Sequence, residues 1–176
     1  MSFIDSIKAR LPDYARDVRL NLDSVLSRSS LEPRRAAGAA LAAAFASRSP
    51  ALVEGLRGGM DPVHAQAALS AAALMGMNNV WYPFVEMADD PDLKSLRPEL
   101  RMNVYATHGG VDRQSFELYA LAASIVGKCE YCVRSHYRLL HDSGLTTQQL
   151  RDVGRIAAVV NAAALVIAVQ AEPVPA

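Results

Sequence analysis

The stretch ELYALAASIVGKCEYCVRSH, residues 117–136, predicts two helices that fold back on each other. Apolar residues recur at helical spacing up to Gly127, and a glycine in that position is typical of a helix end. Glu117 lies ten residues before Gly127, and His136 lies nine residues after it. At about 1.5 Å of rise per residue, both lie roughly 14–15 Å from the turn. In an antiparallel helix pair, Glu117 and His136 can therefore touch.

The second of these helices places both cysteines of the chain beside a histidine. If the helix begins near Cys129, then at about 100° per residue Cys132 lies roughly 300° and His136 roughly 340° around the axis. These three residues share one face. Tyr131 falls near 200° and His141 near 120°, so they point elsewhere.

This face has the residues of a redox-active dithiol. A thiol in the first turn of a helix favours its thiolate form, because unpaired N–H groups and the helix dipole stabilise the charge. Cys132 lies one turn after Cys129 and can close a disulfide with it. His136 can accept or relay the proton of Cys132, and Glu117 would fix the tautomer of the imidazole and raise its basicity.

Other interpretations of these residues remain open. Cys129, Cys132, His136 and His141 could form a zinc site, although such sites usually separate the cysteine pair from the histidine pair by a dozen or more residues. The cysteines could instead be ordinary buried thiols, although Lys128 and Glu130 are polar neighbours. Glu117 could lie on a solvated face, and His136 could be a structural histidine.

The rest of the chain favours an all-α fold. Alanine is abundant, and apolar residues recur every three or four positions through most of the sequence. Pro12 and Pro33 stand where helices can begin. Helix starts are also expected at Asp61-Pro62, at Asp112 and at the Thr146/Gln149 capping box. The segment ADDPDLKSLRP, residues 88–98, reads as the main irregular connection.

A weak internal repeat is also visible. Residues 72–81, AALMGMNNVW, align with residues 123–132, ASIVGKCEYC, at an offset of 51 positions. Both copies are small and apolar up to a glycine and then read as a more polar turn. We therefore predict a single domain over residues 1–176, with a degenerate half at about 33–90 and a redox-active half at about 97–171. A chance likeness of two alanine-rich helices is the alternative.

Composition narrows the class of protein. With 18 basic and 18 acidic residues the 176-residue chain is neutral, which does not favour nucleic-acid binding. The start MSFIDSIKARL is not a signal peptide, and the apolar tract 156–171 is short for a membrane span and suits a core helix better. We expect a cytoplasmic protein with no membrane contact, where a close cysteine pair is more often catalytic or metal-binding than structural.

Weaker candidates are interpreted as structural residues. His64, His108 and His141 have no partner pattern, and His108-Gly109-Gly110 reads as a turn. Asn78, Asn79 and Trp81 are expected to pack or cap at a helix end, and Met75 and Met77 to fill the core.

The chain resembles the alkyl hydroperoxide reductase D (AhpD) family, within the carboxymuconolactone decarboxylase-like group. The resemblance rests on Glu117, eleven residues, Cys129-x-x-Cys132, three residues and His136. It extends to IKARLPDYARDVRLNL, LSAAALMGMNNVWY and LRPELRMN, which together span most of the chain.

The resemblance implies an AhpD-like helical domain with two similar halves, usually a homotrimer. It implies an antioxidant thiol peroxidase that reduces organic hydroperoxides and also reduces a partner peroxiredoxin of the AhpC type. The electrons would come from the dihydrolipoyl group of a lipoyl-bearing acyltransferase, with no bound metal or cofactor.

The resemblance also assigns roles to residues of this chain. Cys132 would pass through a sulfenic acid, and Cys129 would act as proton donor and resolving thiol and form the mixed disulfide with the peroxiredoxin. Glu117 and His136 match the proton-relay positions. Tyr131 stands where family members often have a histidine, and a phenol of pKa near 10 is a poor base at neutral pH. A non-redox decarboxylase-like enzyme and a redox-sensing binding module are the alternative functions.

Overall fold

The computed structural model describes residues 3–171, and within this range the chain forms helices and no strand. This confirms the predicted all-α fold. The α-helices are α1 (Phe3–Ala9), α2 (Arg16–Ser27), α3 (Pro33–Ala46), α4 (Pro50–Gly58), α5 (Pro62–Ala88), α6 (Pro91–Ser95), α7 (Val104–Thr107), α8 (Arg113–Gly127), α9 (Glu130–Asp142) and α10 (Thr147–Ala171). Short 3-10 helices lie at Asp13–Ala15 (η1) and His108–Gly110 (η2).

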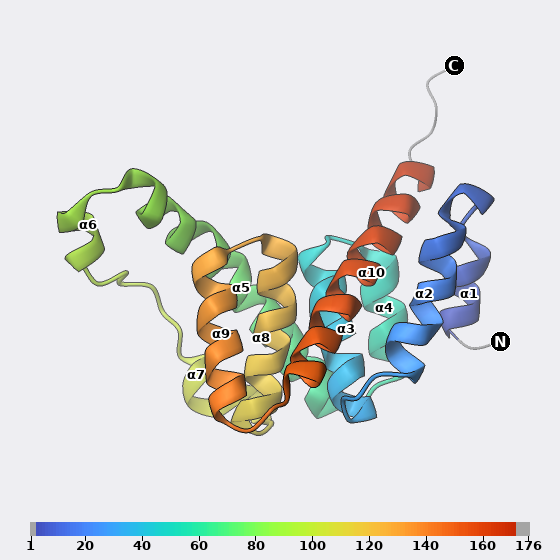
Figure 1. Ribbon diagram of the computed structural model, residues 1–176, viewed down its shortest axis with the longest axis horizontal. Coiled ribbons are helices and arrows are strands. Elements are labelled where there is room, and N and C mark those ends of the chain that lie inside the picture. Colours follow the sequence, from blue (N-terminus) through green and yellow to red (C-terminus); the bar gives the residue numbers. More distant parts are fainter. Residues whose placement is uncertain (1–2, 172–176) are drawn as a thin grey trace, which may run out of the picture.

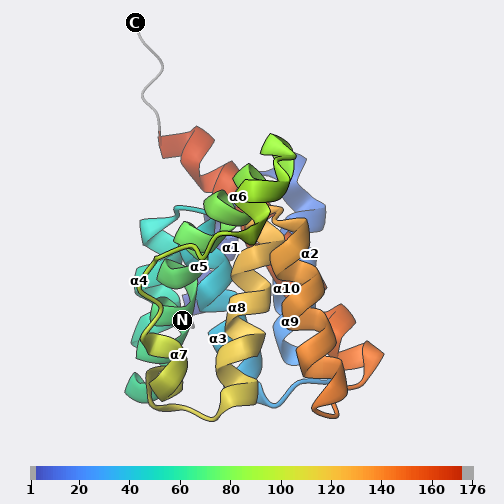
Figure 2. The ribbon, with the colours of Figure 1, turned by 90° about the vertical axis from the view of Figure 1, so that its left-hand side faces the viewer.

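Three alanine-rich helices, α3, α5 and α8, pack against one another at the centre of the molecule. Ala39, Ala67 and Ala122 are fully buried, and such small side chains let the helix backbones approach closely. α10 crosses this core and contacts α2, α3 and α8, while α9 lies beside α8 (Figures 1 and 2). The helix that follows Cys129, α9, therefore packs with one side against the core.

The predicted helix starts are confirmed by their hydrogen bonds. The Asp61 carboxylate accepts bonds from the backbone N–H groups of Val63 and His64 at the start of α5. Asp112 accepts from the Ser115 N–H at the start of α8. At the start of α10 the Thr146 hydroxyl accepts from the Gln149 N–H, and the Gln149 side chain accepts from the Thr146 N–H. These bonds satisfy amides that a helix leaves unpaired at its N-terminus.

The structure corrects two expectations about the middle of the chain. The segment 88–98 is not wholly irregular, because it contains α6, whose start is capped by Asp90. Together with the end of α5, α6 projects away from the body of the molecule (Figure 1). The repeat also predicts a turn after Gly76, but α5 continues through Asn78, Asn79 and Trp81. Packing of α5 against both α3 and α8 outweighs the weak helix propensity of Gly76.

α10 is long and apolar enough to cross a membrane by length and composition alone. It is also a core helix, because Val153, Ile156 and Ala157 are fully buried against the neighbouring helices. Buried helices of water-soluble proteins commonly have this composition.

Candidate active site

The turn between α8 and α9 positions the two cysteines. α8 ends at Gly127, and Lys128 adopts a left-handed conformation with φ of 56°. Cys129 follows as the N-cap of α9, and its sulfur accepts a hydrogen bond from the Cys132 N–H at 3.2 Å. The predicted helix break and helix start are thereby confirmed, and the first cysteine lies where the backbone amides of α9 are unpaired.

Cys129 and Cys132 form a disulfide, with Cα atoms 5.3 Å apart. Cys129 is fully buried and Cys132 is 3% exposed. On its inner side, Cys132 Sγ lies 3.8 Å from the backbone oxygen of Asn78, in α5. The disulfide is thus enclosed between the start of α9 and the middle of α5.

Glu117 and His136 lie in direct contact, as the antiparallel arrangement of α8 and α9 predicts. His136 Nδ1 is 2.6 Å from Glu117 Oε2, and both side chains are buried. A buried carboxylate beside an imidazole holds the ring in a fixed orientation and determines which ring nitrogen faces it. The only other cation paired with Glu117 within residues 3–171 is Arg113, one helical turn earlier, at 4.0 Å. The solvated-face interpretation of Glu117 does not fit this arrangement, because its side chain is buried.

Met75 also belongs to this site, which the sequence did not indicate. Its thioether sulfur lies 3.2 Å from His136 Nε2, and its side chain is fully buried. Met75 and Asn78 are one turn apart on α5 and face His136 and Cys132, which are one turn apart on α9. The half of the chain predicted to be degenerate therefore supplies two contacts to the site. In the sequence, nothing distinguishes Met75 from a methionine that fills the core.

His141 and Tyr131, which are predicted to point away from the face of the two cysteines, do lie away from the site. His141 is exposed, with its ring parallel to that of Tyr137. Tyr131 is half exposed and stacks on Tyr82, with ring centroids 4.4 Å apart. The four ligands of the alternative zinc site are consequently not brought together. Among residues 3–171 no group of three or more His, Cys, Asp or Glu side chains is arranged to hold a metal ion.

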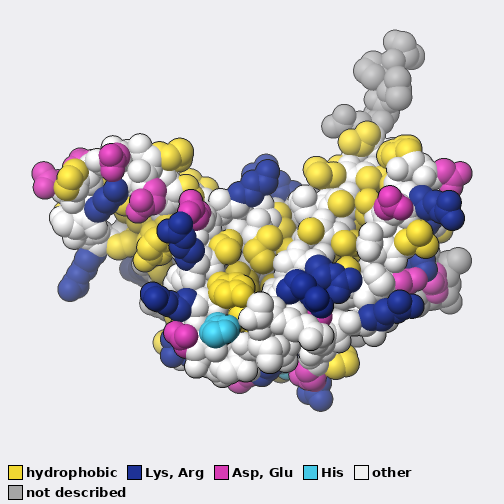
Figure 3. Space-filling model, viewed as in Figure 1, with side chains coloured by type: hydrophobic (Ala, Val, Ile, Leu, Met, Phe, Trp, Pro, Cys, Tyr) yellow, Lys and Arg dark blue, Asp and Glu magenta, His cyan; other side chains and the backbone are white. Residues whose placement is uncertain are grey.

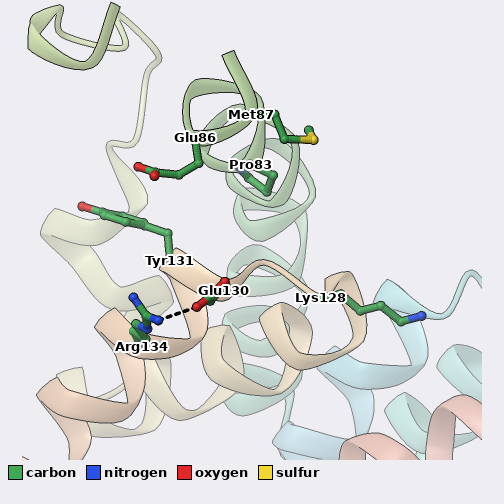
Figure 4. Close-up of a pocket in the computed structure, with 7 residues that line it drawn as sticks. All are labelled: Pro83, Glu86, Met87, Lys128, Glu130, Tyr131 and Arg134. Carbon is green, nitrogen blue, oxygen red and sulfur yellow. Dashed lines mark hydrogen bonds and ion pairs between the residues drawn. The ribbon is translucent and has the colours of Figure 1, made fainter. Parts of the chain in front are cut away.

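A groove of about 490 Å³ lies between the end of α5 and the start of α9 (Figure 4). Its walls combine apolar and charged side chains, and an Arg134–Glu130 ion pair spans one turn of α9 in its floor. Its lining residues are Pro83, Glu86, Met87, Lys128, Glu130, Tyr131 and Arg134. Two of these lining residues, Lys128 and Glu130, flank Cys129 in the chain, so the groove lies next to the turn that holds the first cysteine.

A second opening, of about 450 Å³, reaches the Glu117–His136 pair from another side. Its wall includes Tyr105, His108 and Arg113. Burial, with the neighbouring Glu117 charge, raises the pKa of Tyr105 far above its usual value, so Tyr105 remains a neutral phenol. Because Glu117 and His136 line this opening and the cysteines do not, protons can reach the pair without passing the cysteines.

Three buried polar atoms have no hydrogen-bond partner within the described part of the protein. They are Asn78 Oδ1 and Asn79 Oδ1, on α5, and Ser124 Oγ, on α8. Ser124 is linked to the cysteines through its backbone, because its carbonyl accepts a bond from the Cys129 N–H. Buried polar atoms rarely stay unpaired, so these three atoms are unusual in a protein core.

Comparison with known proteins agrees with this geometry. Residues 91–171 match the model of the carboxymuconolactone decarboxylase family. The chain is 45% identical to a protein named alkyl hydroperoxide reductase AhpD from Rhodospirillum centenum, over 96% of this chain and 92% of the relative. Proteins of the same name from Streptomyces avermitilis and Methylocella silvestris are 42% and 40% identical, over 90% and 98% of this chain and 92% and 98% of the relatives.

Proposed function

The chain belongs to the AhpD family of alkyl hydroperoxide reductases, and on this premise we propose that it is an antioxidant thiol peroxidase that reduces organic hydroperoxides. The observation that carries the proposal is the buried Cys129–Cys132 disulfide at a helix start, with the Glu117–His136 pair one turn further along α9. These groups are the parts that a dithiol peroxidase needs: a nucleophilic sulfur, a resolving sulfur and a proton carrier.

In the proposed oxidative half of the cycle, His136, supported by Glu117, takes the proton of Cys132. The thiolate attacks the terminal oxygen of the hydroperoxide, the O–O bond breaks, and the alkoxide leaves with a proton from Cys129. Cys132 is then a sulfenic acid. The Cys129 thiolate attacks its sulfur, the disulfide forms, and hydroxide leaves as water with the proton held by His136. Hydroperoxide and two thiols become alcohol, water and one disulfide.

In the proposed reductive half, a dithiol reopens the disulfide. We assign this role to a dihydrolipoyl group on a lipoyl-bearing acyltransferase, and we assign Cys129 as the sulfur that also forms a mixed disulfide with an AhpC-type peroxiredoxin. The position of Cys129 supports this assignment, because the residues on either side of it line the groove of Figure 4.

We also propose that the protein works as a homotrimer in the cytoplasm. Apolar side chains remain exposed on the projecting end of α5 and on α10, including Val80, Phe84, Met87, Leu165 and Val169. Figure 3 shows such surface around the projecting segment and over α10. Burying this area in a subunit interface is favourable at about 25 cal/mol per Å². Light scattering of the purified protein measures the mass of the assembly.

A peroxidase assay tests the proposed function. The protein is mixed with cumene hydroperoxide and excess dihydrolipoamide, and alcohol formation is followed with and without an AhpC-type peroxiredoxin. We expect many turnovers in wild type and none in Cys132→Ser. Full turnover in Cys132→Ser would remove Cys132 from the reaction and overturn the proposed thiol cycle. No turnover in wild type would favour a non-redox enzyme, such as the decarboxylase for which the matching family is named. Oxidation that stops after one equivalent of peroxide, with dithiol in excess, would favour a redox sensor.

A further inference from the structure

The Met75 thioether completes a buried row of three side chains, Glu117, His136 and Met75, that runs from α8 through α9 to α5. The two contacts are 2.6 Å and 3.2 Å, and all three side chains are buried, although Glu117 and His136 line the second opening. A methionine that only fills the core needs no such short contact between its sulfur and a ring nitrogen. The contact therefore constrains the protonation of His136.

Hydrogen-bond chemistry fixes what this row holds. A thioether has lone pairs and no hydrogen, so it accepts a bond and donates none. His136 Nε2 must then carry the proton that it directs at Met75. At Nδ1 a second proton lies between the ring and the Glu117 carboxylate, whichever of the two groups holds it. In the disulfide form, the pair is consequently loaded with a transferable proton at Nε2.

We infer that Met75 is a positioning residue that holds the proton-loaded His136 ring beside the disulfide, ready for the reductive half of the cycle. This inference rests on the proposed function. Met75 of α5 contacts His136 of α9. One turn away along both helices, Asn78 contacts Cys132. Cys132 and His136 are four residues apart on α9, so the ring stays on the same face of the helix as the sulfur that is released. Until that sulfur is free, the Met75 thioether accepts the hydrogen bond from Nε2.

The step balances as follows. A donor thiolate attacks Cys129 Sγ, the Cys129–Cys132 bond breaks, and its electron pair goes to Cys132 Sγ. Free of Cys129, this side chain rotates toward His136 and takes the Nε2 proton. A thiolate is a stronger hydrogen-bond acceptor than a thioether, so the Nε2 proton turns from Met75 to the Cys132 sulfur. The second donor thiol then attacks the donor sulfur of the mixed disulfide, the bond to Cys129 breaks, and the donor disulfide closes. Cys129 leaves as a thiolate and takes the proton of that thiol. His136 regains a proton from solvent through the Tyr105–Arg113 opening after the next oxidation.

The first test is NMR of the disulfide form of the wild-type protein, labelled with ¹⁵N at histidine. We expect the His136 ring to show a protonated Nε2 near neutral pH, with slow exchange against water. An Nε2 without a proton would overturn the inference. This measurement needs no variant and no turnover, so it is read even if the protein proves inactive as a peroxidase.

The second test separates the two half-reactions by rapid mixing. Met75→Leu keeps the volume and removes the acceptor, and we expect it to slow reduction by dihydrolipoamide about five- to tenfold, as for loss of one modest hydrogen bond. Oxidation by cumene hydroperoxide should change by less than about twofold, since that half begins with an unprotonated Nε2. Met75→Gln restores an acceptor and should recover most of the reductive rate.

Met77→Leu is the matched control, because Met77 lies on the same helix and packs against the core without touching His136. It should leave both half-reactions unchanged. Equal slowing of both half-reactions in Met75→Leu would show a general packing role, and no slowing of either would show no role; each result overturns the inference. If wild type itself performs neither half-reaction, the proposed function fails instead.

Discussion

Gly127 lies directly against the side chain of Asn79, where α8 ends beside the middle of α5. A methyl group on Gly127 would come within 2.6 Å of Asn79 Cγ. Asn79 has little freedom to withdraw, because its Nδ2 donates a hydrogen bond to the Ala123 carbonyl at 3.2 Å. The glycine therefore allows α5 to reach the site while α8 ends two residues before Cys129.

Gly127→Ala should lower the free energy of unfolding by about 1–3 kcal/mol, because the added methyl displaces Asn79 and breaks its bond to α8. Urea denaturation followed by circular dichroism measures this change. Gly154→Ala is the control. No heavy atom lies within 4 Å of a methyl group there, and the substitution should stabilise α10 by about 0.5–1 kcal/mol. Equal effects of the two substitutions would contradict the packing argument.

Exposure of the reduced protein to one equivalent of hydroperoxide should oxidise both cysteines to the disulfide. Trypsin cuts after Lys128 and Arg134, so both cysteines fall in the peptide CEYCVR. Without reduction, this peptide should lose about two hydrogens in mass and resist alkylation. In Cys129→Ser we expect Cys132 to be trapped as a sulfenic acid that dimedone labels. An unlabelled Cys132 would remove it from the role of peroxidatic residue.

Glu117→Gln should slow peroxide reduction at least tenfold while the protein stays folded. The amide has the size of the carboxylate but cannot stabilise a proton on His136, and general acid–base catalysis of this kind contributes about 10²–10⁴-fold. Stopped-flow oxidation and thermal denaturation provide the two measurements. Arg113→Gln is a useful companion, because it removes the more distant partner of Glu117 and should have a smaller effect. An undiminished rate in Glu117→Gln would exclude Glu117 from the relay.

Tyr131→Phe should leave peroxide reduction within about twofold of wild type. The Tyr131 ring stacks on Tyr82 at the surface, on a different side of α9 from Cys132 and His136. Burial, followed by the nearby Tyr131, raises the pKa of Tyr82, so the Tyr82 phenol in this stack stays neutral near pH 7. Tyr137→Phe serves as the control on the same helix. A tenfold loss limited to Tyr131→Phe would assign its hydroxyl a part in proton transfer.

Protonation of Asp152 should make the protein less stable in acid. Burial alone would raise the pKa of its carboxyl, but bonds from the Ser30 N–H and hydroxyl and from Arg151 and Arg155 outweigh burial and hold the pKa well below its usual range. A depressed folded-state pKa gives stability that is present above the unfolded value, about 3.9, and lost as the pH falls through the folded value.

Asp152→Asn should therefore lower the free energy of unfolding by about 1–3 kcal/mol at pH 7. The difference from wild type should stay constant at neutral pH and shrink below about pH 4. Denaturant melts at a series of pH values measure it. Asp142→Asn, at an exposed residue near the end of α9, should show no such trend. A difference from wild type that stays constant from pH 7 down to pH 2 would contradict the titration argument.

The sequence alone determined the local features of this protein. Helical periodicity, the caps at Asp61 and Asp112 and the break at Gly127 are set by neighbouring residues, so they could be predicted without coordinates. The spacing of Glu117 and His136 around Gly127 was also sufficient, because helix rise converts equal separation from a turn into equal depth.

Tertiary structure decided what depends on contacts between distant segments. It kept α5 helical across Gly76 and Asn78, where local preference indicated a turn, because packing on both sides outweighs propensity. It also brought Met75 within 3.2 Å of His136, across 61 positions of sequence. A methionine in an alanine-rich helix has the same local pattern whether it fills the core or accepts a proton from a histidine, and only the packing of α5 against α9 distinguishes the two.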